Sequence, residues 1–425
     1  MKEDLGPLAP EVILAASAVA GLLAGSWLPR NRQWLIRAMA AAACLAGLAA
    51  AGLAATQPVT TDFGTSYHID VATGAVRIVI LAALLLVLGL SAGPVAAHPR
   101  ETEFYVLLQL AALGTIVLAG AGDLLLLFAG YLLASVPGYV LAGFGKDAPG
   151  TEAAVKYYLI GALLGALMLA GITVLDGVAG TTSYAPLHAA LAAAPHGTVT
   201  VGVIAGLAGL LFTAGAVPAH FWVPDVTEGS SAPVAAFFQT SPKRLLAYST
   251  ISQAGYLLMA IAAAARSALA TRALLFYLAA YAVTNLGAFA VVTALPQATT
   301  LDSYRGLARR HSGLAAVLVV CLLGLVGTPP TAVFLGKLEI FTATIDGGYT
   351  WLAALAIANT IASLFYYLRW LAPAFLRAPG ATRPDPLATA GRWPATVAYA
   401  AGTISIALGV AAGAVLPLLA GTLLR

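Results

Sequence analysis

The sequence predicts an all-α membrane protein that crosses the bilayer about twelve times. Of its 425 residues, 60% are hydrophobic and only 9% are charged, whereas about 25% is usual in a soluble protein. The mean hydropathy of +0.91 indicates the same class. Apolar runs recur along the whole chain, and most approach the roughly 20 residues that a helix needs to span a bilayer.

The expected spans follow one another with short connections. They cover residues 9–28, 35–55, 76–96, 104–120, 122–144, 153–177, 198–217, 232–264, 270–294, 313–346, 350–373 and 396–420. The number of passes is even, so both termini should lie on one side of the membrane. The polar segment 299–312 is read either as a short interfacial helix or as a basic loop. A short amphipathic helix is expected near 186–194.

The distribution of basic residues predicts the side. With both termini outside, the cytoplasmic loops carry Arg30, Arg32, Arg37, Arg100, Lys146, Lys156, Arg305, Arg309, Arg310, Arg377, Arg383 and Arg392. The outer side then carries only Lys2, Arg77, Arg266, Arg272 and Arg425. Cytoplasmic loops are enriched in Lys and Arg, so this orientation is favoured.

A helix break is expected at Pro218, where the apolar run 198–217 ends. A proline frees backbone carbonyls, and these are tolerated in a membrane only where protein or water satisfies them. Ionisable side chains at such depth usually mark an ion or proton path. Three follow this break within nine residues, and we take them as proton-path candidates: His220, Asp225 and Glu228.

A second break is expected at Pro329 and Pro330, inside the run 313–346. Lys337 follows seven residues later, or about 10 Å along a helix. A lysine removed from water gives up its proton more readily, as a proton relay requires. The alternative is a lysine whose side chain reaches the interface. Two interrupted spans in one chain are typical of transporter-like cores.

Lys243 lies between two apolar runs and is the fifth proton-path candidate. If 232–264 is one composite helix, its charge lies at mid-depth and needs a partner. If 232–242 is instead a re-entrant or interfacial piece, Lys243 anchors the chain at the membrane surface. The sequence leaves both readings open. Asp123 opens a helix and is expected to interact with its N-terminal dipole.

Redox and nucleotide motifs are absent from the sequence. No Cys cluster could hold an iron–sulfur centre, and neither GxGxxG nor GxxxxGK[ST] occurs. Cys44 and Cys321 lie in apolar runs and are read as packing residues. We therefore expect no cofactor, metal or nucleic acid in this chain, and a function in conduction, coupling or scaffolding.

Five segments resemble a known family. They are PAHFWVPDVTEGSSAPVAAF (218–237), KRLLAYSTISQAGYLL (243–258), NLGAFAVV (285–292), DSYRGLARRH (302–311) and LVGTPPTAVFLGKLEIF (325–341). Together they are similar to subunit N of bacterial NADH-quinone oxidoreductase, respiratory complex I, over residues 100–375. KYYLIGALLGALMLAGITVL (156–175) resembles subunit N more than its sister subunits.

The resemblance implies two inverted five-helix repeats, each with one broken helix, and a buried row of charges that carries protons. Lys337 matches the family's lysine on the second broken helix. Two positions depart from the family: Leu132 replaces a glutamate and Thr213 replaces a lysine. About two helices are also missing beside Lys243. The first half of the conduction machinery therefore looks degraded.

The resemblance also implies a setting: the bacterial plasma (inner) membrane, with the other membrane subunits of complex I and the lipid bilayer as partners. NADH, flavin, iron–sulfur clusters and quinone are expected in other subunits. Within the chain we expect N-terminal helices over 1–100, a proton-translocation core over 101–375, and a loop with a last helix over 376–425. The alternative functions are a non-conducting structural or assembly paralogue and a subunit of a multisubunit cation/proton antiporter.

Overall fold

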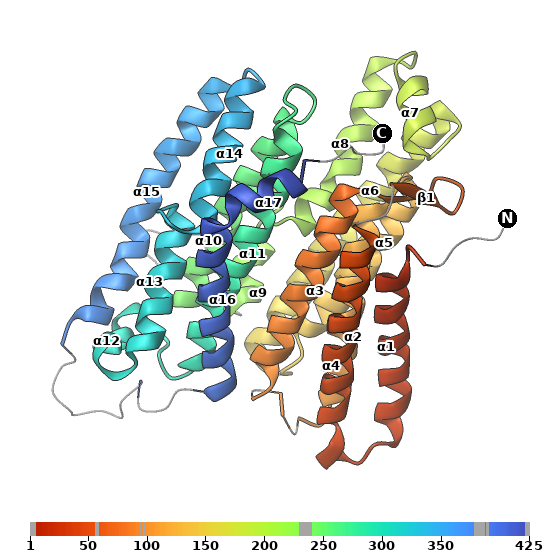
Figure 1. The fold of residues 1–425 in the computed structure, drawn as a ribbon. Coiled ribbons are helices and arrows are strands. Elements are labelled where there is room, and N and C mark those ends of the chain that lie inside the picture. The colour runs from red at the N-terminus through yellow and green to blue at the C-terminus, as the bar shows by residue number, and fades with distance from the viewer. Residues whose placement is uncertain are drawn as a thin grey trace. The chain divides into compact units, whose positions relative to one another are not determined.

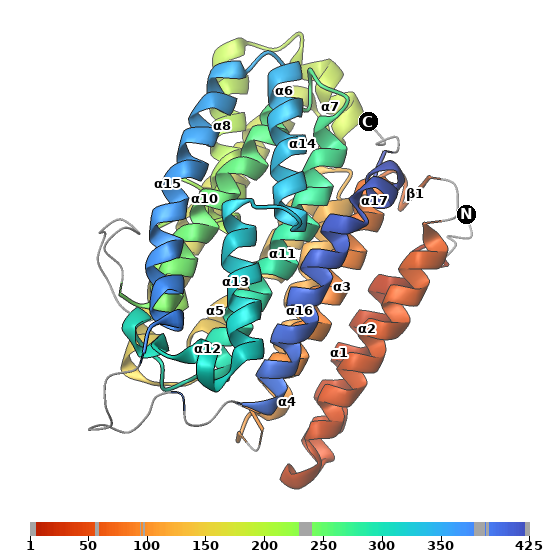
Figure 2. The same ribbon diagram turned by 60° about the vertical axis from the view of Figure 1, so that its left-hand side comes forward.

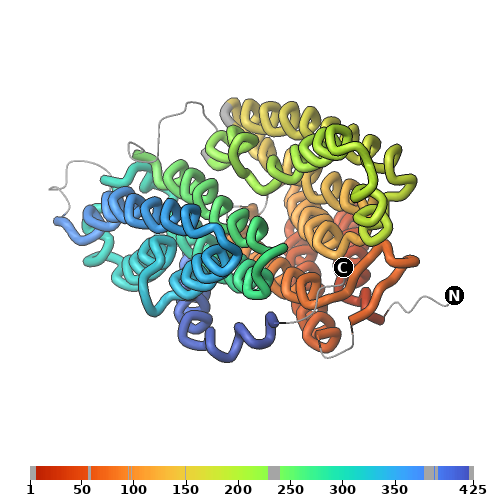
Figure 3. The backbone as a smooth tube through the Cα atoms, turned by 90° about the horizontal axis from the view of Figure 1, so that it is seen from above, coloured from red at the N-terminus to blue at the C-terminus, as the bar shows by residue number. Residues whose placement is uncertain are grey.

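The computed structural model describes residues 6–55, 59–93, 95–96, 98–228, 240–377, 387 and 391–420. The chain forms two compact units, and each is described by itself. Unit 1 holds residues 1–88 and 97–230, and unit 2 holds 89–96 and 231–420. Within each unit the long helices run side by side (Figures 1 and 3).

Unit 1 contains nine α-helices and one β-hairpin in its described residues. The helices are α1 (Ala9–Trp27), α2 (Trp34–Ala54), α3 (Val71–Ser91, in this unit up to Leu88), α4 (Glu101–Gly120), α5 (Leu124–Ala142), α6 (Ala148–Ala179), α7 (Tyr184–Leu191), α8 (His196–Thr213) and α9 (Trp222–Glu228). The hairpin pairs β1 (Thr60–Asp62) with β2 (Tyr67–Ile69) in antiparallel fashion, Thr61 opposite His68.

Unit 2 is helical throughout its described residues. Its α-helices are α10 (Pro242–Ala263), α11 (Ala270–Ala294), α12 (Leu307–Arg310), α13 (Ser312–Val326), α14 (Ala332–Asp346), α15 (Thr350–Phe375), α16 (Arg392–Val410) and α17 (Ala412–Leu418), with a 3-10 turn η3 (Leu301–Tyr304). Its core gathers small and aromatic residues from α10, α11 and α14, among them Tyr256, Tyr277 and Ile340.

The predicted membrane class is confirmed. Eleven described helices are long and apolar enough to cross a membrane. The two shorter helices α13 and α14 follow each other on either side of a break and together replace the span expected over 313–346 (Figure 2). The last expected span, 396–420, is divided between α16 and the short α17. Segment 299–312 forms η3 and α12.

Both predicted helix breaks are confirmed, and each lies at the prolines. The first interrupts the chain between Thr213 and Trp222, and the second between Val326 and Ala332. The bonds Val217–Pro218 and Pro329–Pro330 are both cis. At the second break Gly327 takes a φ of 98°, a backbone conformation that glycine adopts without steric cost and that ends helices.

The composite span over 232–264 falls partly outside the described residues, since 229–239 are not among them. Helix α10 begins at Pro242 and has 22 residues. This length is enough to cross the bilayer without the residues that precede it. Proline at the first helical position suits a helix start because the missing N–H has no partner there.

Small residues bring the helices of unit 1 close together. A Cβ at Gly171 of α6 would collide with the backbone of Gly206 on α8, so these helices meet backbone to backbone, as membrane helices with small residues do. The Gly- and Ala-rich run at 161–171 thus ends at a close helix contact. Cys44 and Cys321 are buried free thiols.

Two features of unit 1 were not predicted from the sequence. Arg77, an expected outer-side charge, lies in the second turn of α3 with no exposed surface, and its side of the membrane stays a prediction. The β-hairpin was not predicted at all. By contrast, Asp123 caps α5 as expected, its Oδ1 accepting from the Leu126 N–H at 2.7 Å.

Candidate functional site

The second break leaves two backbone carbonyls at the end of α13 without their usual helical donors. In an α-helix the carbonyls of Leu325 and Val326 would accept from the N–H groups four residues on. Those residues are Pro329 and Pro330, and proline has no N–H. A buried carbonyl without a partner is costly, above all where no water can reach it.

Lys337 supplies the missing donors. Its Nζ lies 3.0 Å from the carbonyl oxygens of both Leu325 and Val326. The lysine is one and a half turns into α14 and only 3% exposed, so the side chain turns back toward the end of α13. The prolines that break the helix therefore also create the binding site for the lysine amine.

Gln253 of α10 meets the same helix end. Its Nε2 donates to the Leu325 carbonyl at 3.2 Å, and its Oε1 accepts from the hydroxyl of Tyr277 on α11. Gln253 and Tyr277 are buried. The end of α13 is thus held by side chains from α10 and α14, and α11 supports them.

Tyr256 covers the other side of the amine. The Lys337 Nζ lies 4.5 Å from the centroid of its ring, a cation–π distance. The Tyr256 hydroxyl hydrogen-bonds with the Thr360 hydroxyl at 2.7 Å and accepts from the Asn359 amide at 3.0 Å, both on α15. Hydrogen-bonding side chains therefore continue from the lysine to α15.

We call Lys337, Gln253, Tyr256, Tyr277 and Asn359 the Lys337 network. It draws mainly on one stripe of α10, where further hydroxyls bond to neighbouring helices. Thr250 accepts from the Tyr281 hydroxyl at 2.9 Å, and Ser249 bonds the Tyr367 hydroxyl. The network lies entirely within unit 2.

Neutral groups surround the amine. Among the described residues no carboxylate lies within ion-pair distance of Lys337, and the acid nearest in sequence, Glu339, pairs with Arg272 of α11 at 3.2 Å. Uncompensated burial disfavours the charged form of a lysine. A buried amine held by neutral acceptors is therefore chemically suited to lose and regain a proton.

The first break, in unit 1, is satisfied differently. The indole Nε1 of Trp222 donates to the Phe212 carbonyl at 2.9 Å, and the indole stacks on Tyr157 with ring centroids 4.2 Å apart. Thr213, at the end of α8, hydrogen-bonds back to its own helix at Gly209. An indole N–H, which does not ionise near neutral pH, takes the place that the lysine amine has at the second break.

The candidate acids and histidine after Pro218 do not come together with Lys337 in any described contact. His220 is half-buried and stacks on Phe221, and its Nδ1 has no hydrogen-bond partner. Asp225 pairs with Lys156 of α6 at 3.3 Å, and Lys156 also pairs with Glu152 at 2.8 Å. Glu228 is the last residue of α9, and its side chain lies outside the described part.

Lys243 lies in the first turn of α10 and is exposed. The residues before it, 229–239, lie outside the described part of the chain, and the role of Lys243 in the proton path stays a prediction.

The family model described as "NADH:quinone oxidoreductase/Mrp antiporter, TM" matches residues 121–241 and 234–363. The chain is 49% identical to NADH-quinone oxidoreductase subunit N 1 of Streptomyces griseus, covering 98% of both chains. It is 45% identical to subunit N of a Mycobacterium species, covering 97% of this chain and 98% of the relative. The chain belongs to the family of NADH-quinone oxidoreductase subunit N.

Solved structures agree on the fold. A chain of respiratory complex I from Thermus thermophilus with bound aureothin superposes with a TM-score of 0.82 at 29% identity, covering 97% of this chain and 100% of that one. A chain of the Mrp complex from Dietzia also reaches 0.82, at 21% identity, covering 98% of this chain and 96% of that one. The subunit N fold is thus shared with an antiporter.

This chain is shorter than its Streptomyces relative. Their alignment spans 464 positions, more than the 425 residues of this chain, so that relative has residues with no counterpart here. The two matches to the family model overlap at 234–241, and the missing stretch beside Lys243 stays a prediction.

The two positions expected to depart from the subunit N pattern lie in unit 1. Leu132 is 43% exposed on α5, and Thr213 bonds only within α8 among the contacts described. Neither position offers an ionisable group. Lys156 forms ion pairs with Asp225 and Glu152, which the sequence does not predict, because its expected place is a loop.

Proposed function

We propose that this chain transfers protons across the membrane as subunit N of a proton-translocating NADH-quinone oxidoreductase, and that Lys337 is its proton-carrying group. The observation that carries the proposal is the position of Lys337: buried, uncompensated by any described carboxylate, and bonded to two carbonyls at the break of a helix.

The geometry allows the amine to change its protonation state without losing its place. A charged lysine has three N–H donors and the neutral amine has two. The carbonyls of Leu325 and Val326 take two donors, so both bonds persist in the neutral form. The third N–H is the exchangeable one, and in the neutral amine a lone pair replaces it.

The other residues of the Lys337 network would orient the third N–H of the lysine amine, or the lone pair that replaces it. Gln253 fixes the Leu325 carbonyl, and the Tyr256 ring favours the charged amine from its face. Asn359 and Thr360 hold the Tyr256 hydroxyl toward α15. Hydroxyl and amide side chains can bind water molecules, and a proton can pass along a chain of such water molecules.

The setting follows from the family. We propose that the chain lies in the bacterial plasma membrane beside other membrane subunits of the oxidoreductase, surrounded by lipid, with both termini outside, as the basic residues suggest. NADH, flavin, iron–sulfur clusters and quinone belong to other subunits, and the chain itself carries out no electron transfer.

A second candidate function has one specific observation in its favour. Leu132 and Thr213 remove the ionisable groups of the first half, so the chain would conduct through one half only or serve as a non-conducting structural or assembly component. An antiporter subunit is a weaker candidate, because the most similar relatives reported above are all named subunit N.

Affinity purification tests the assignment. The tagged chain is extracted from membranes in mild detergent, and the eluate is assayed for NADH-quinone reductase activity and, after reconstitution, for proton translocation. We expect the complete, active oxidoreductase. Recovery of the chain alone or with antiporter subunits would contradict the proposal, whereas an active complex that translocates normally after replacement of Lys337 would favour the structural role.

A further inference from the structure

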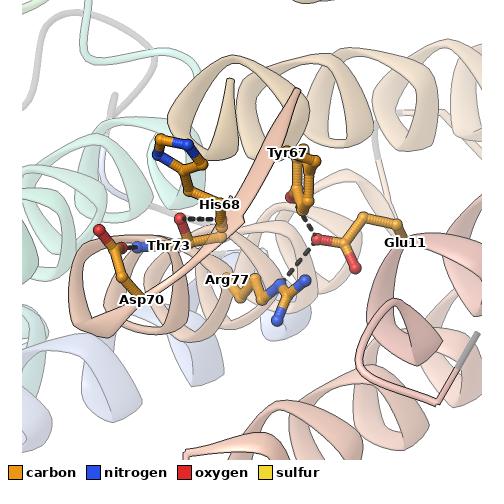
Figure 4. A network of polar contacts seen from close by, with 6 residues as sticks. All are labelled: Glu11, Tyr67, His68, Asp70, Thr73 and Arg77. Atoms are coloured by element: carbon orange, nitrogen blue, oxygen red, sulfur yellow. Dashed lines mark hydrogen bonds and ion pairs between the residues drawn. The ribbon is translucent and has the colours of Figure 1, made fainter. Parts of the chain in front are cut away.

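A second buried ionisable centre lies in unit 1, far along the chain from Lys337. Figure 4 shows Glu11 of α1, Tyr67 of β2 and Arg77 of α3 converging. The Glu11 Oε1 accepts from the Arg77 Nε and from the Tyr67 hydroxyl, each at 2.7 Å. Arg77 is fully buried and Glu11 is 8% exposed. Ionisable residues within membrane segments are functional-site candidates by default.

This centre has more hydrogen-bonding capacity than the described residues use. Both terminal nitrogens of Arg77 and the second carboxylate oxygen of Glu11 are buried without a partner. Buried polar groups that lack protein partners are typically bonded to internal water. Burial, and next the charge of Glu11, raise the pKa of Tyr67 above its ordinary value, so the tyrosine remains a donor.

A second polar pair lies deeper, between α1 and α4. The packing of Gly25 against Thr102 and of Gly21 against Val106 fixes the antiparallel register of these helices. One further turn places Ser17 level with Gln109. Gln109 has no exposed surface, and the Ser17 hydroxyl and the Gln109 Oε1 are both buried without a hydrogen-bond partner.

A third set of polar side chains lies at the N-terminal end of α4. The Tyr105 hydroxyl bonds to Glu101 at 3.4 Å, and Arg37 of α2 interacts with the same hydroxyl. Thr102 adds a buried hydroxyl without a partner. The Gln109 Nε2 donates to the Tyr105 carbonyl at 3.3 Å, which links this group to the middle pair.

The three groups are spaced for water. Glu11 and Ser17 are six residues apart on α1, about 9 Å along the helix. Gln109 and Tyr105 are one turn apart on α4, about 6 Å. These values are separations along each helix axis, and internal water would bridge the polar side chains. At the Glu11 end, a cavity of about 260 Å³ borders Glu11 and Tyr67, and its other lining side chains are apolar. Phe63, on its wall, is 50% exposed.

We propose that α1, α3 and α4 enclose a file of internal waters that conducts protons between Glu101 and Glu11, by a route separate from Lys337. Its protein ligands are Tyr105, Gln109, Ser17, Arg77 and Glu11. The route uses the N-terminal helices, outside the part of the chain to which the family model applies.

Proton passage along this file needs no other reactant. Each water accepts a proton on its oxygen and gives another to the next water. At the Glu11 end the free carboxylate oxygen takes the proton and forms an O–H bond, which then breaks toward water in the cavity. Arg77 keeps its charge throughout.

Proton-to-electron ratios test the route in the complete oxidoreductase. Proteoliposomes are prepared with wild type, Gln109→Leu, Lys337→Met and the double variant, and protons translocated per NADH oxidised are measured. Thr115→Val is the matched control, because this α4 hydroxyl bonds only to its own helix, at Ala111. Subunit content and uncoupled reductase activity establish that each complex is assembled.

We expect Gln109→Leu to lower the ratio, Thr115→Val to leave it unchanged, and the double variant to lose the sum of the two single losses. Ser17→Ala, a milder change, should lower the ratio by less. An unchanged ratio in both Gln109→Leu and Ser17→Ala, or a double variant equal to Lys337→Met, would overturn the separate route. A loss with Gln109→Leu but none with Lys337→Met would retain this route and reject the proposed role of Lys337.

Discussion

The Lys337 amine lies 3.0 Å from the Val326 carbonyl, the acceptor that would have bonded to residue 330 if that residue were not proline. The helix break and the buried lysine are therefore one structural unit. The break exposes an acceptor, the lysine satisfies it, and the resulting bond holds an ionisable group inside the membrane. A change in the helix break should therefore affect the lysine, and replacement of the lysine should affect the break.

Loss of the amine should destabilise unit 2 as well as affect proton transfer. Lys337→Ala leaves the Val326 carbonyl without a described donor, and a buried unsatisfied acceptor costs about 1–3 kcal/mol. The purified complex should show a lower unfolding temperature for this subunit. Lys243→Ala, an exposed lysine at the start of α10, is the control and should have little effect. Equal stability of both variants would contradict the capping role.

Gln253 and Tyr277 should behave as a coupled pair. Gln253→Leu leaves the buried Tyr277 hydroxyl without its acceptor, and Tyr277→Phe leaves the Gln253 oxygen without its donor. Each single variant should lose about 1–3 kcal/mol of stability, and the double variant should lose less than the sum, because both members of the bond are then absent. Thermal unfolding of all four proteins measures the coupling. Strict additivity would show that the bond contributes nothing.

Gly336 is required by the close approach of α14 to α11. A Cβ at this position would lie 2.8 Å from the Tyr277 side chain and 3.1 Å from its Cα. The backbone cannot yield easily, so Gly336→Ala should cost about 1–3 kcal/mol and shift Lys337 on the next position. Gly206→Ala, where a Cβ meets nothing within 4 Å, is the control and should be tolerated. A stable, fully coupled Gly336→Ala variant would contradict the packing described.

Removing one member of the Glu11–Arg77 ion pair should lower stability more than removing both members. Arg77→Leu leaves a buried carboxylate with only Tyr67, and breaking a buried pair in this way costs about 3–5 kcal/mol. Replacing both residues, as Glu11→Leu with Arg77→Leu, removes the uncompensated charge and should recover part of the loss. Unfolding of the single and double variants measures this, and an equally severe double variant would point to a packing rather than an electrostatic effect.

The sequence predicted those features that depend on local composition. Both breaks were found because proline cannot continue a helix, and Lys337 was found because a charge within an apolar run is conspicuous. The capping of α5 by Asp123 likewise follows from a local signal. In each case the deciding residues lie within a few positions of one another.

Features that depend on packing could not be read from the sequence. The bond of Gln253 to Leu325 joins residues 72 positions apart, and nothing in the periodicity of α10 fixes which helix end its polar stripe meets. The burial of Arg77 could not be predicted, because an arginine six residues into a helix has the same hydropathy whether its side chain reaches the interface or pairs inward. Its partner, Glu11, is 66 positions away.

The most direct measurement is the proton-to-electron ratio of the reconstituted oxidoreductase with Lys337→Met, which keeps an unbranched apolar side chain as far as Cε but cannot carry a proton. We expect NADH oxidation in uncoupled proteoliposomes to stay near the wild-type rate, while fewer protons are translocated per NADH. An assembled complex with the wild-type ratio would contradict the claim that Lys337 carries protons.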